Sequence, residues 1–115
     1  MTIKESNITV NVKGLSKSIL FYESIGLTVK QRWGDFYAQM TAPGITIGLH
    51  PSIESNLPGN SGNVSIGFTV DNFEEAKTFL RDKNIEVTSR QEEGGQFLHF
   101  KDLDGISLYF IKPKQ

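Results

Sequence analysis

The sequence predicts an α+β protein built from two tandem β-α-β-β-β modules, because one pattern of strands and a helix occurs twice within 115 residues. The clearest repeat is a hairpin at residues 95–111, whose tight turn contains Asp104 and Gly105. Glycine takes a positive φ at such a turn without steric cost. Moved back by 61 positions, this hairpin lies on residues 34–51. The identical pairs are then Gly34/Gly95, Phe36/Phe97, Gly44/Gly105 and Ile45/Ile106.

The segments before the two hairpins also match, at an offset of 58 positions. Residues 7–12 alternate polar and apolar side chains, which predicts a half-buried strand. A helix is expected next, with Ser16 as its N-cap and Gly26 as its C-terminal stop. The second module should repeat this order with a helix over 72–83 and a strand over 85–89. The matched pairs include Ile8/Ile66, Val12/Val70, Leu15/Phe73, Phe21/Phe79, Leu27/Ile85 and Val29/Val87.

The two modules span residues 1–51 and 63–115 and are expected to form a single domain. Residues 52–62 between them are rich in Pro, Gly, Ser and Asn, which is typical of a linker. The offset grows from 58 to 61 before Gly95, so the second module carries three extra residues around Glu92.

Composition indicates a folded, soluble and cytoplasmic protein, with 37% hydrophobic and 22% charged residues. The formal net charge of −1 argues against a nucleic-acid partner, because no basic stripe is present. No apolar run reaches the length needed to span a membrane, and none near Met1 resembles a signal peptide. The absence of cysteine excludes disulfides, thiolate nucleophiles and thiolate metal sites.

Two motifs carry a family resemblance that covers nearly the whole chain. Residues 12–23, VKGLSKSILFYE, resemble the V-x-D-L-x-x-S-x-x-F-Y opening of the vicinal oxygen chelate superfamily, and residues 102–105, DLDG, resemble its D-P-D-G turn. That superfamily includes glyoxalase I, extradiol dioxygenases, and fosfomycin and bleomycin resistance proteins. The resemblance implies a curved mixed sheet that encloses a cavity, with the helices on its convex side, and a homodimer.

The alternation of side chains along each strand then assigns residues to the expected cavity. If Leu98 and Phe100 pack outward against a helix, Phe97 and His99 point inward, and the same rule turns Tyr109 inward. In the first module, burial of the apolar positions turns Asn7 and His50 inward in the same way. Trp33, the only tryptophan, is either a rim residue or a stacking surface for a flat ligand. The expected ligand-binding residues are His99, His50, Tyr109, Phe97, Asn7 and Trp33.

The four positions that hold the metal in enzymes of this superfamily align with Asn7, Gly48, Ser65 and Tyr109. The resemblance implies His, Gln or Glu there. Gly48 has no donor atom, Asn7 and Ser65 are poor ligands for transition metals, and a tyrosine ligand must first ionise. We therefore expect no metal and no cofactor.

His50 and His99 allow two interpretations. Imidazole groups bind metals and act as general bases, so the pair could form a relocated metal site with Glu92 or Glu93, or an acid–base pair. The simpler interpretation is that each is a polar wall residue. Arg32 and Arg90, at comparable strand ends, could receive a carboxylate or phosphate, although such residues are more often solvated surface.

Two functions from different classes follow. The first is a metal-independent protein that binds a small, partly aromatic molecule, for resistance or sequestration. The alternative is a glyoxalase-type lyase, isomerase or dioxygenase with an unconventional metal or a site built on His50 and His99. The missing metal ligands favour the binding protein.

Overall fold

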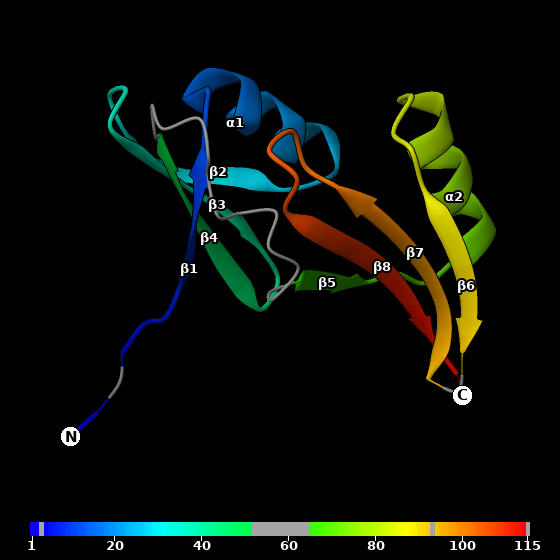
Figure 1. The fold of residues 1–115 in the computed structure, drawn as a ribbon. Coiled ribbons are helices and arrows are strands. Elements are labelled where there is room, and N and C mark those ends of the chain that lie inside the picture. Colours follow the sequence, from blue (N-terminus) through cyan, green and yellow to red (C-terminus); the bar gives the residue numbers. More distant parts are fainter. Residues whose placement is uncertain (3, 52–64, 93, 115) are drawn as a thin grey trace. The chain divides into compact units, whose positions relative to one another are not determined.

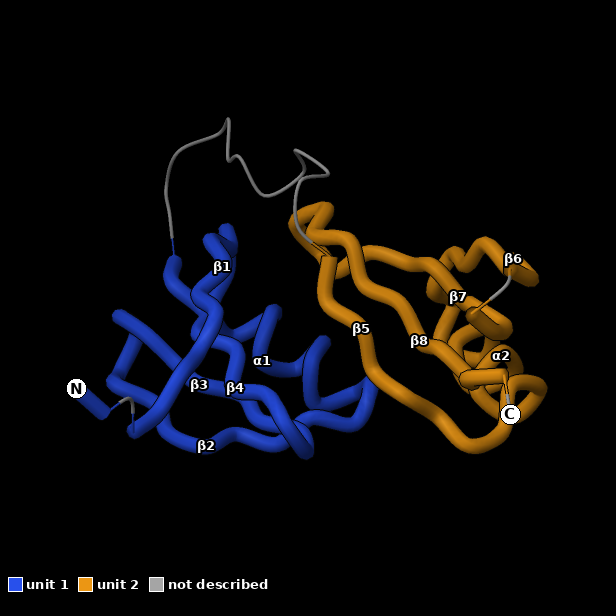
Figure 2. The backbone as a smooth tube through the Cα atoms, turned by 90° about the horizontal axis from the view of Figure 1, so that it is seen from below, with its two compact units in different colours: residues 1–60 blue, residues 61–115 orange. Residues whose placement is uncertain are grey.

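The fold is that of a computed structural model of the chain, and the structure describes residues 1–2, 4–51, 65–92 and 94–114. The chain divides into two compact units, residues 1–60 and 61–115 (Figure 2). The expected linker 52–62 lies outside the described residues. None of the described helices is long and apolar enough to cross a membrane.

The first unit is a four-stranded mixed sheet with one helix on one of its faces (Figure 1). The strands lie in the order β1-β4-β3-β2; β1 is parallel to β4, and the other neighbours are antiparallel. Its elements are β1 (Ile8–Val12), α1 (Leu15–Ser24), β2 (Thr28–Trp33), β3 (Tyr37–Ala42) and β4 (Ile45–Pro51).

The second unit repeats this architecture with the strand order β5-β8-β7-β6, and β5 is parallel to β8. The two units together confirm the α+β class and the doubled β-α-β-β-β order. The elements are β5 (Ser65–Thr69), α2 (Phe73–Asp82), β6 (Thr88–Glu92), β7 (Gly95–Lys101) and β8 (Ser107–Pro113).

Each unit buries the apolar side of its sheet beneath its own helix, as the alternation predicted. In the first unit Tyr22, Ile47 and Leu49 have no exposed surface, and in the second Leu80 and Leu98 have none. Burial of such side chains stabilises a fold by about 1.5–3 kcal/mol each. Ile8 departs from the expected burial and is 42% exposed, because it is the first residue of β1.

The helix starts differ between the units. Gly14, not Ser16, is the N-cap of α1, and no side chain caps that helix. Ser16 lies inside the first turn, where its Oγ accepts a hydrogen bond from Arg32 at 3.1 Å. In α2, Asn72 is the N-cap and its Oδ1 accepts from the backbone N–H of Glu75 at 3.0 Å. Gly26 ends the first helix region with φ +113°, as expected.

Two sequence-based placements are corrected by the strand register. The strand expected at 85–89 lies at Thr88–Glu92. The offset of 61 positions between the two hairpins holds only for their second strands, β4 and β8, where Gly48 corresponds to Tyr109. Gln39 pairs with Gly48 and His99 pairs with Tyr109, so β3 and β7 match at an offset of 60.

The turn between β7 and β8 is longer than the turn between β3 and β4, which explains why the offset changes from 60 to 61 positions. Asp102 holds this turn: its Oδ1 accepts from the backbone N–H of Asp104 and of Ile106, both at 2.8 Å. Gly105 adopts φ +87°, as the turn requires. The structural counterpart of Phe97 is therefore Tyr37, not Phe36.

Candidate functional site

The helix-free face of a sheet is defined here as the face opposite the helix of its own unit. In the second unit, three rings from β7 and β8 gather on this face: Phe97, His99 and Tyr109. The Phe97 and His99 rings stack with 5.7 Å between centroids and 9° between planes. The Tyr109 centroid lies 5.8 Å from both. All three side chains are half-buried, so the structure brings these predicted site residues into one cluster.

An open cavity of about 400 Å³ adjoins this cluster. Thr88, Arg90, Glu92 and His99 line it. Alternation along β6 places its three lining residues on one face, and Thr88 pairs directly with His99 across the strands. Sequence analysis missed Thr88 and did not recognise this row, because the strand was placed three residues too early. The signal was available: the polar run from Thr88 to Glu92 suits an edge strand.

The first unit carries a different set on its helix-free face. The Trp33 and Tyr37 rings have centroids 5.4 Å apart. The Tyr37 hydroxyl and Thr9 Oγ1 are hydrogen-bonded at 3.2 Å, and Thr9 donates to Asn7 Oδ1 at 3.4 Å. Asn7 and Trp33 are thus connected through Thr9, which alternation had placed on the same face as Asn7, and through Tyr37, which the sequence had not indicated.

His50 lies on β4 opposite Asn11 and is exposed. It belongs to the first unit and His99 to the second, and each histidine is described within its own unit.

A tyrosine covers one glycine on each helix-free face. A side chain at Gly48 would meet the Tyr37 hydroxyl, and its Cβ would lie 2.7 Å from Thr9 Oγ1. In the second unit, a side chain at Gly67 would meet the ring of Tyr109. Gly48 and Gly67 thus leave the space that the two tyrosines occupy.

The two strand-end arginines differ in their partners. Arg32 donates to Gly34 O at 2.8 Å, to Ser16 Oγ at 3.1 Å and to Asp35 Oδ1 at 3.2 Å. Arg90, in the described part of the chain, has neither an ion pair nor a side-chain hydrogen bond. Its guanidinium is available to a ligand.

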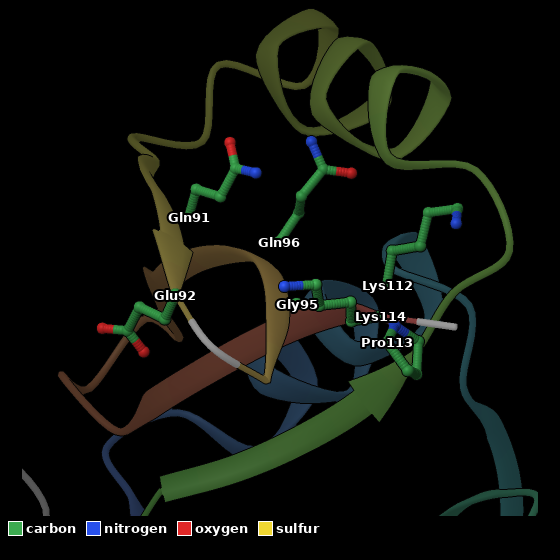
Figure 3. Close-up of a pocket in the computed structure, with 7 residues that line it drawn as sticks. All are labelled: Gln91, Glu92, Gly95, Gln96, Lys112, Pro113 and Lys114. Carbon is green, nitrogen blue, oxygen red and sulfur yellow. The ribbon is translucent and has the colours of Figure 1, made fainter.

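A second cavity, of about 280 Å³, lies at the end of the β5-β8-β7-β6 sheet (Figure 3). Gln91 and Gln96 point to the side of α2, as their pairing across β6 and β7 requires. Glu92, Gly95, Lys112, Pro113 and Lys114 complete the lining. Its polar lining includes no aromatic ring, in contrast to the cavity beside His99.

A family model for the Glyoxalase/Bleomycin resistance protein/Dioxygenase superfamily matches residues 6–110, nearly the whole chain. The chain belongs to this superfamily. No curated protein sequence matches it. The resemblance inferred from residues 12–23 and 102–105 is therefore confirmed at the level of the family.

Three solved structures share the fold at low sequence identity. A hypothetical protein from S. aureus is 21% identical with a TM-score of 0.80, and the match covers 97% of this chain and 95% of that one. A bleomycin-binding protein in complex with bleomycin is 15% identical, with a TM-score of 0.74 and coverage of 97% and 100%. The fosfomycin resistance protein FosX from Listeria monocytogenes, in complex with Mn(II) and sulfate, is 18% identical, with a TM-score of 0.80 and coverage of 99% and 93%.

The residues at the superfamily's metal positions do not fit a transition metal in this chain. Asn7 and Ser65 are exposed amide and hydroxyl groups at the start of β1 and β5. Gly48 offers no donor, and Tyr37 occupies the space above it. Tyr109 packs its ring over Gly67. Among the described residues, no group of three His, Asp or Glu side chains is placed to hold a metal ion.

Proposed function

We propose that this chain is a metal-independent, small-molecule-binding member of the superfamily, and that its ligand binds on the Phe97–His99–Tyr109 cluster. The observation that carries this proposal is the cluster itself, three half-buried rings of which one, His99, lines a cavity of about 400 Å³. Small-molecule sites of a few hundred Å³ are commonly lined by aromatic side chains with a few polar groups.

The chemistry of the cluster suits a flat ligand. Aromatic rings offer large apolar surfaces, and offset or edge contacts with another ring contribute about 0.5–1.5 kcal/mol beyond the burial of area. Thr88 and His99 add hydrogen-bonding groups at the cavity wall. The shared fold with the bleomycin-binding protein supports a role in resistance or sequestration, because that protein was solved with its drug bound.

The test of ligand binding is a titration of isotope-labelled protein with metal-free bleomycin and with small aromatic compounds, followed by amide chemical shifts. We expect shifts centred on β7 and β8, and their loss in the Phe97→Ala/Tyr109→Ala variant. Thr78→Ala serves as a matched control, because this exposed residue lies on α2, on the opposite side of the same sheet from the cluster. If neither bleomycin nor the small aromatic compounds change the amide shifts of β7 and β8, the binding site is not on this face.

Metal independence is tested by melting the protein with added Zn²⁺, Ni²⁺ or Mn²⁺. A site at 100 times its Kd would stabilise the fold by about 2.7 kcal/mol. In a domain of this size, that would raise Tm by several degrees. We expect a much smaller change, and no difference between the wild type and the His50→Ala/His99→Ala variant. A large shift that this double variant removes would replace the proposal with an unconventional metalloenzyme of glyoxalase type.

We also infer a homodimer. β2 forms one edge of its sheet and all its residues are exposed, and Trp33 and Phe36 at its end are 42% and 80% exposed. Exposed strand edges and apolar patches favour pairing with another chain. Light scattering should return twice the chain mass of 12.8 kDa at high micromolar protein. A monomer mass there would contradict the inference.

A further inference from the structure

We propose that the ligand of the Phe97–His99–Tyr109 cluster is a planar aromatic molecule that carries a carboxylate, and that Arg90 binds this carboxylate. The inference rests on the proposed function, since it names the ligand class for the same site. It uses the strand register around the cluster, the partners of the two strand-end arginines, and the signs of the neighbouring charges.

The register places Arg90 beside the rings. Arg90 pairs with Phe97 across β6 and β7, and Thr88 pairs with His99 in the neighbouring position on the same face. Directly opposite residues in an antiparallel pair have Cβ atoms about 4.5–5.5 Å apart. A molecule that lies flat on the Phe97 and His99 rings therefore has its edge within reach of both the guanidinium and the Thr88 hydroxyl.

The guanidinium of Arg90 is not used by the protein within the described residues, whereas Arg32 is held by three acceptors. An exposed arginine without a partner is by itself ordinary. Arg90, however, lines the same cavity as His99. A guanidinium presents a fixed pair of N–H groups that match the two oxygens of a carboxylate, so it selects a planar anion and fixes its orientation.

The charges around the cavity favour a single negative charge over a phosphate. Among the described residues, Arg90 is the only cation that lines it, and Glu92 lies two residues along the same face of β6. A doubly charged phosphate would face this carboxylate with only one cation to offset it. Lys101 projects from the same face of β7, two positions beyond His99, but does not line the cavity. One guanidinium beside an aromatic surface fits an aromatic monocarboxylate.

The experiment compares two probes of nearly the same shape, the anionic 4-hydroxybenzoate and the neutral 4-hydroxybenzamide, by amide chemical-shift titration of the full chain. We expect both to shift β7 and β8, with the benzoate binding about tenfold more tightly, which corresponds to about 1.4 kcal/mol. Arg90→Gln should abolish this preference and leave the binding of the amide unchanged. Glu92→Gln should increase the affinity for the benzoate, because it removes a like charge.

Arg32→Gln and Lys101→Gln are the matched controls, and both should keep the tenfold preference. Melting curves of each variant establish that it is folded. Equal binding of the two probes by the wild type, or a preference that Lys101→Gln removes and Arg90→Gln keeps, would overturn the role of Arg90 and leave the proposed function standing. If neither probe shifts β7 or β8, the assignment of the aromatic face fails together with this inference.

Discussion

The helix-free faces of the two sheets derive from one repeated pattern but use their polar side chains differently. In the first unit, the Tyr37 hydroxyl, Thr9 and Asn7 are hydrogen-bonded to one another. In the second, Thr88 and Arg90 border an open cavity and the rings of Phe97, His99 and Tyr109 contact each other. The first face thus joins three of its polar side chains to one another, whereas Arg90 on the second has no hydrogen-bond or ion-pair partner among the described residues.

A single pair of positions shows how this difference arises. Trp33 pairs with Tyr37 in the first unit, and Arg90 pairs with Phe97 in the second. The two pairs occupy equivalent places in the repeat, so an indole in one unit stands where a guanidinium stands in the other. A repeated backbone can thus support two unlike surfaces, because a change of one side chain alters the chemistry without altering the register.

The largest effect is expected from exchanging the core residues at one repeated position. Ala38 and Leu98 are equivalent and neither has exposed surface. Leu98→Ala should lower the free energy of unfolding by about 2–5 kcal/mol, because it leaves a cavity beside Phe110. Ala38→Leu should lower it by about 1–3 kcal/mol by overpacking. Urea denaturation measures both, and a neutral result for either would mean that the two cores are interchangeable.

A smaller effect is expected at the turn that distinguishes the hairpins. Asp102 is 7% exposed and accepts two backbone hydrogen bonds, whereas the tighter β3–β4 turn uses Pro43-Gly44. Asp102→Ala should cost about 1.5–3 kcal/mol in unfolding free energy, since two buried N–H groups lose their acceptor. Asp102→Asn keeps an acceptor oxygen and should cost less. The control is Leu103→Ala, at an exposed neighbouring position, which should change the unfolding free energy by no more than about 0.5 kcal/mol.

The smallest effect concerns the tyrosine that covers Gly48. Gly48→Ala should destabilise the first unit by about 1 kcal/mol, because the new methyl group displaces the Tyr37 hydroxyl from Thr9. In a Tyr37→Ala background the same substitution should cost less, since the space is already vacant. A double-mutant cycle by chemical denaturation measures this coupling. Strictly additive free energies would mean that Tyr37 and Gly48 do not compete for space.

The sequence was sufficient for the architecture because the signals were repeated and long. Alternation predicted the buried sides of β4, β7 and β8, and the doubled hairpin predicted two modules. The sequence alignment of the two hairpins was wrong by one residue in their first strands. It matched Phe36 with Phe97 because both are phenylalanine, but the strand pairing makes Tyr37 the counterpart of Phe97. The identity of Phe36 and Phe97 could not reveal that the turn between β7 and β8 is longer than the turn between β3 and β4.

The candidate site could be predicted only in part. The inward orientation of Phe97, His99 and Tyr109 followed from the period of a strand. Other features of the site depend on side-chain rotamers and on pairing between strands that are distant in the sequence. They are the contacts among these rings, the lack of a partner for Arg90 among the described residues, and the packing of Tyr37 over Gly48. Neither the rotamers nor this pairing is encoded in local periodicity, which is why Tyr37 was missed, whereas Thr88 was missed because its strand was placed three residues too early.

The strand order within each unit also governs how the chain is made. β1 has β4 as its only neighbour in the first sheet, and β5 has only β8 in the second. During synthesis, the first strand of a unit therefore cannot pair within its sheet until the last strand of that unit has left the ribosome. The local β2–β3 hairpin can pair beforehand, because its contacts are close in sequence. A nascent chain that stops at Ala42 lacks β4, so Ile8–Val12 then has no strand on which to dock.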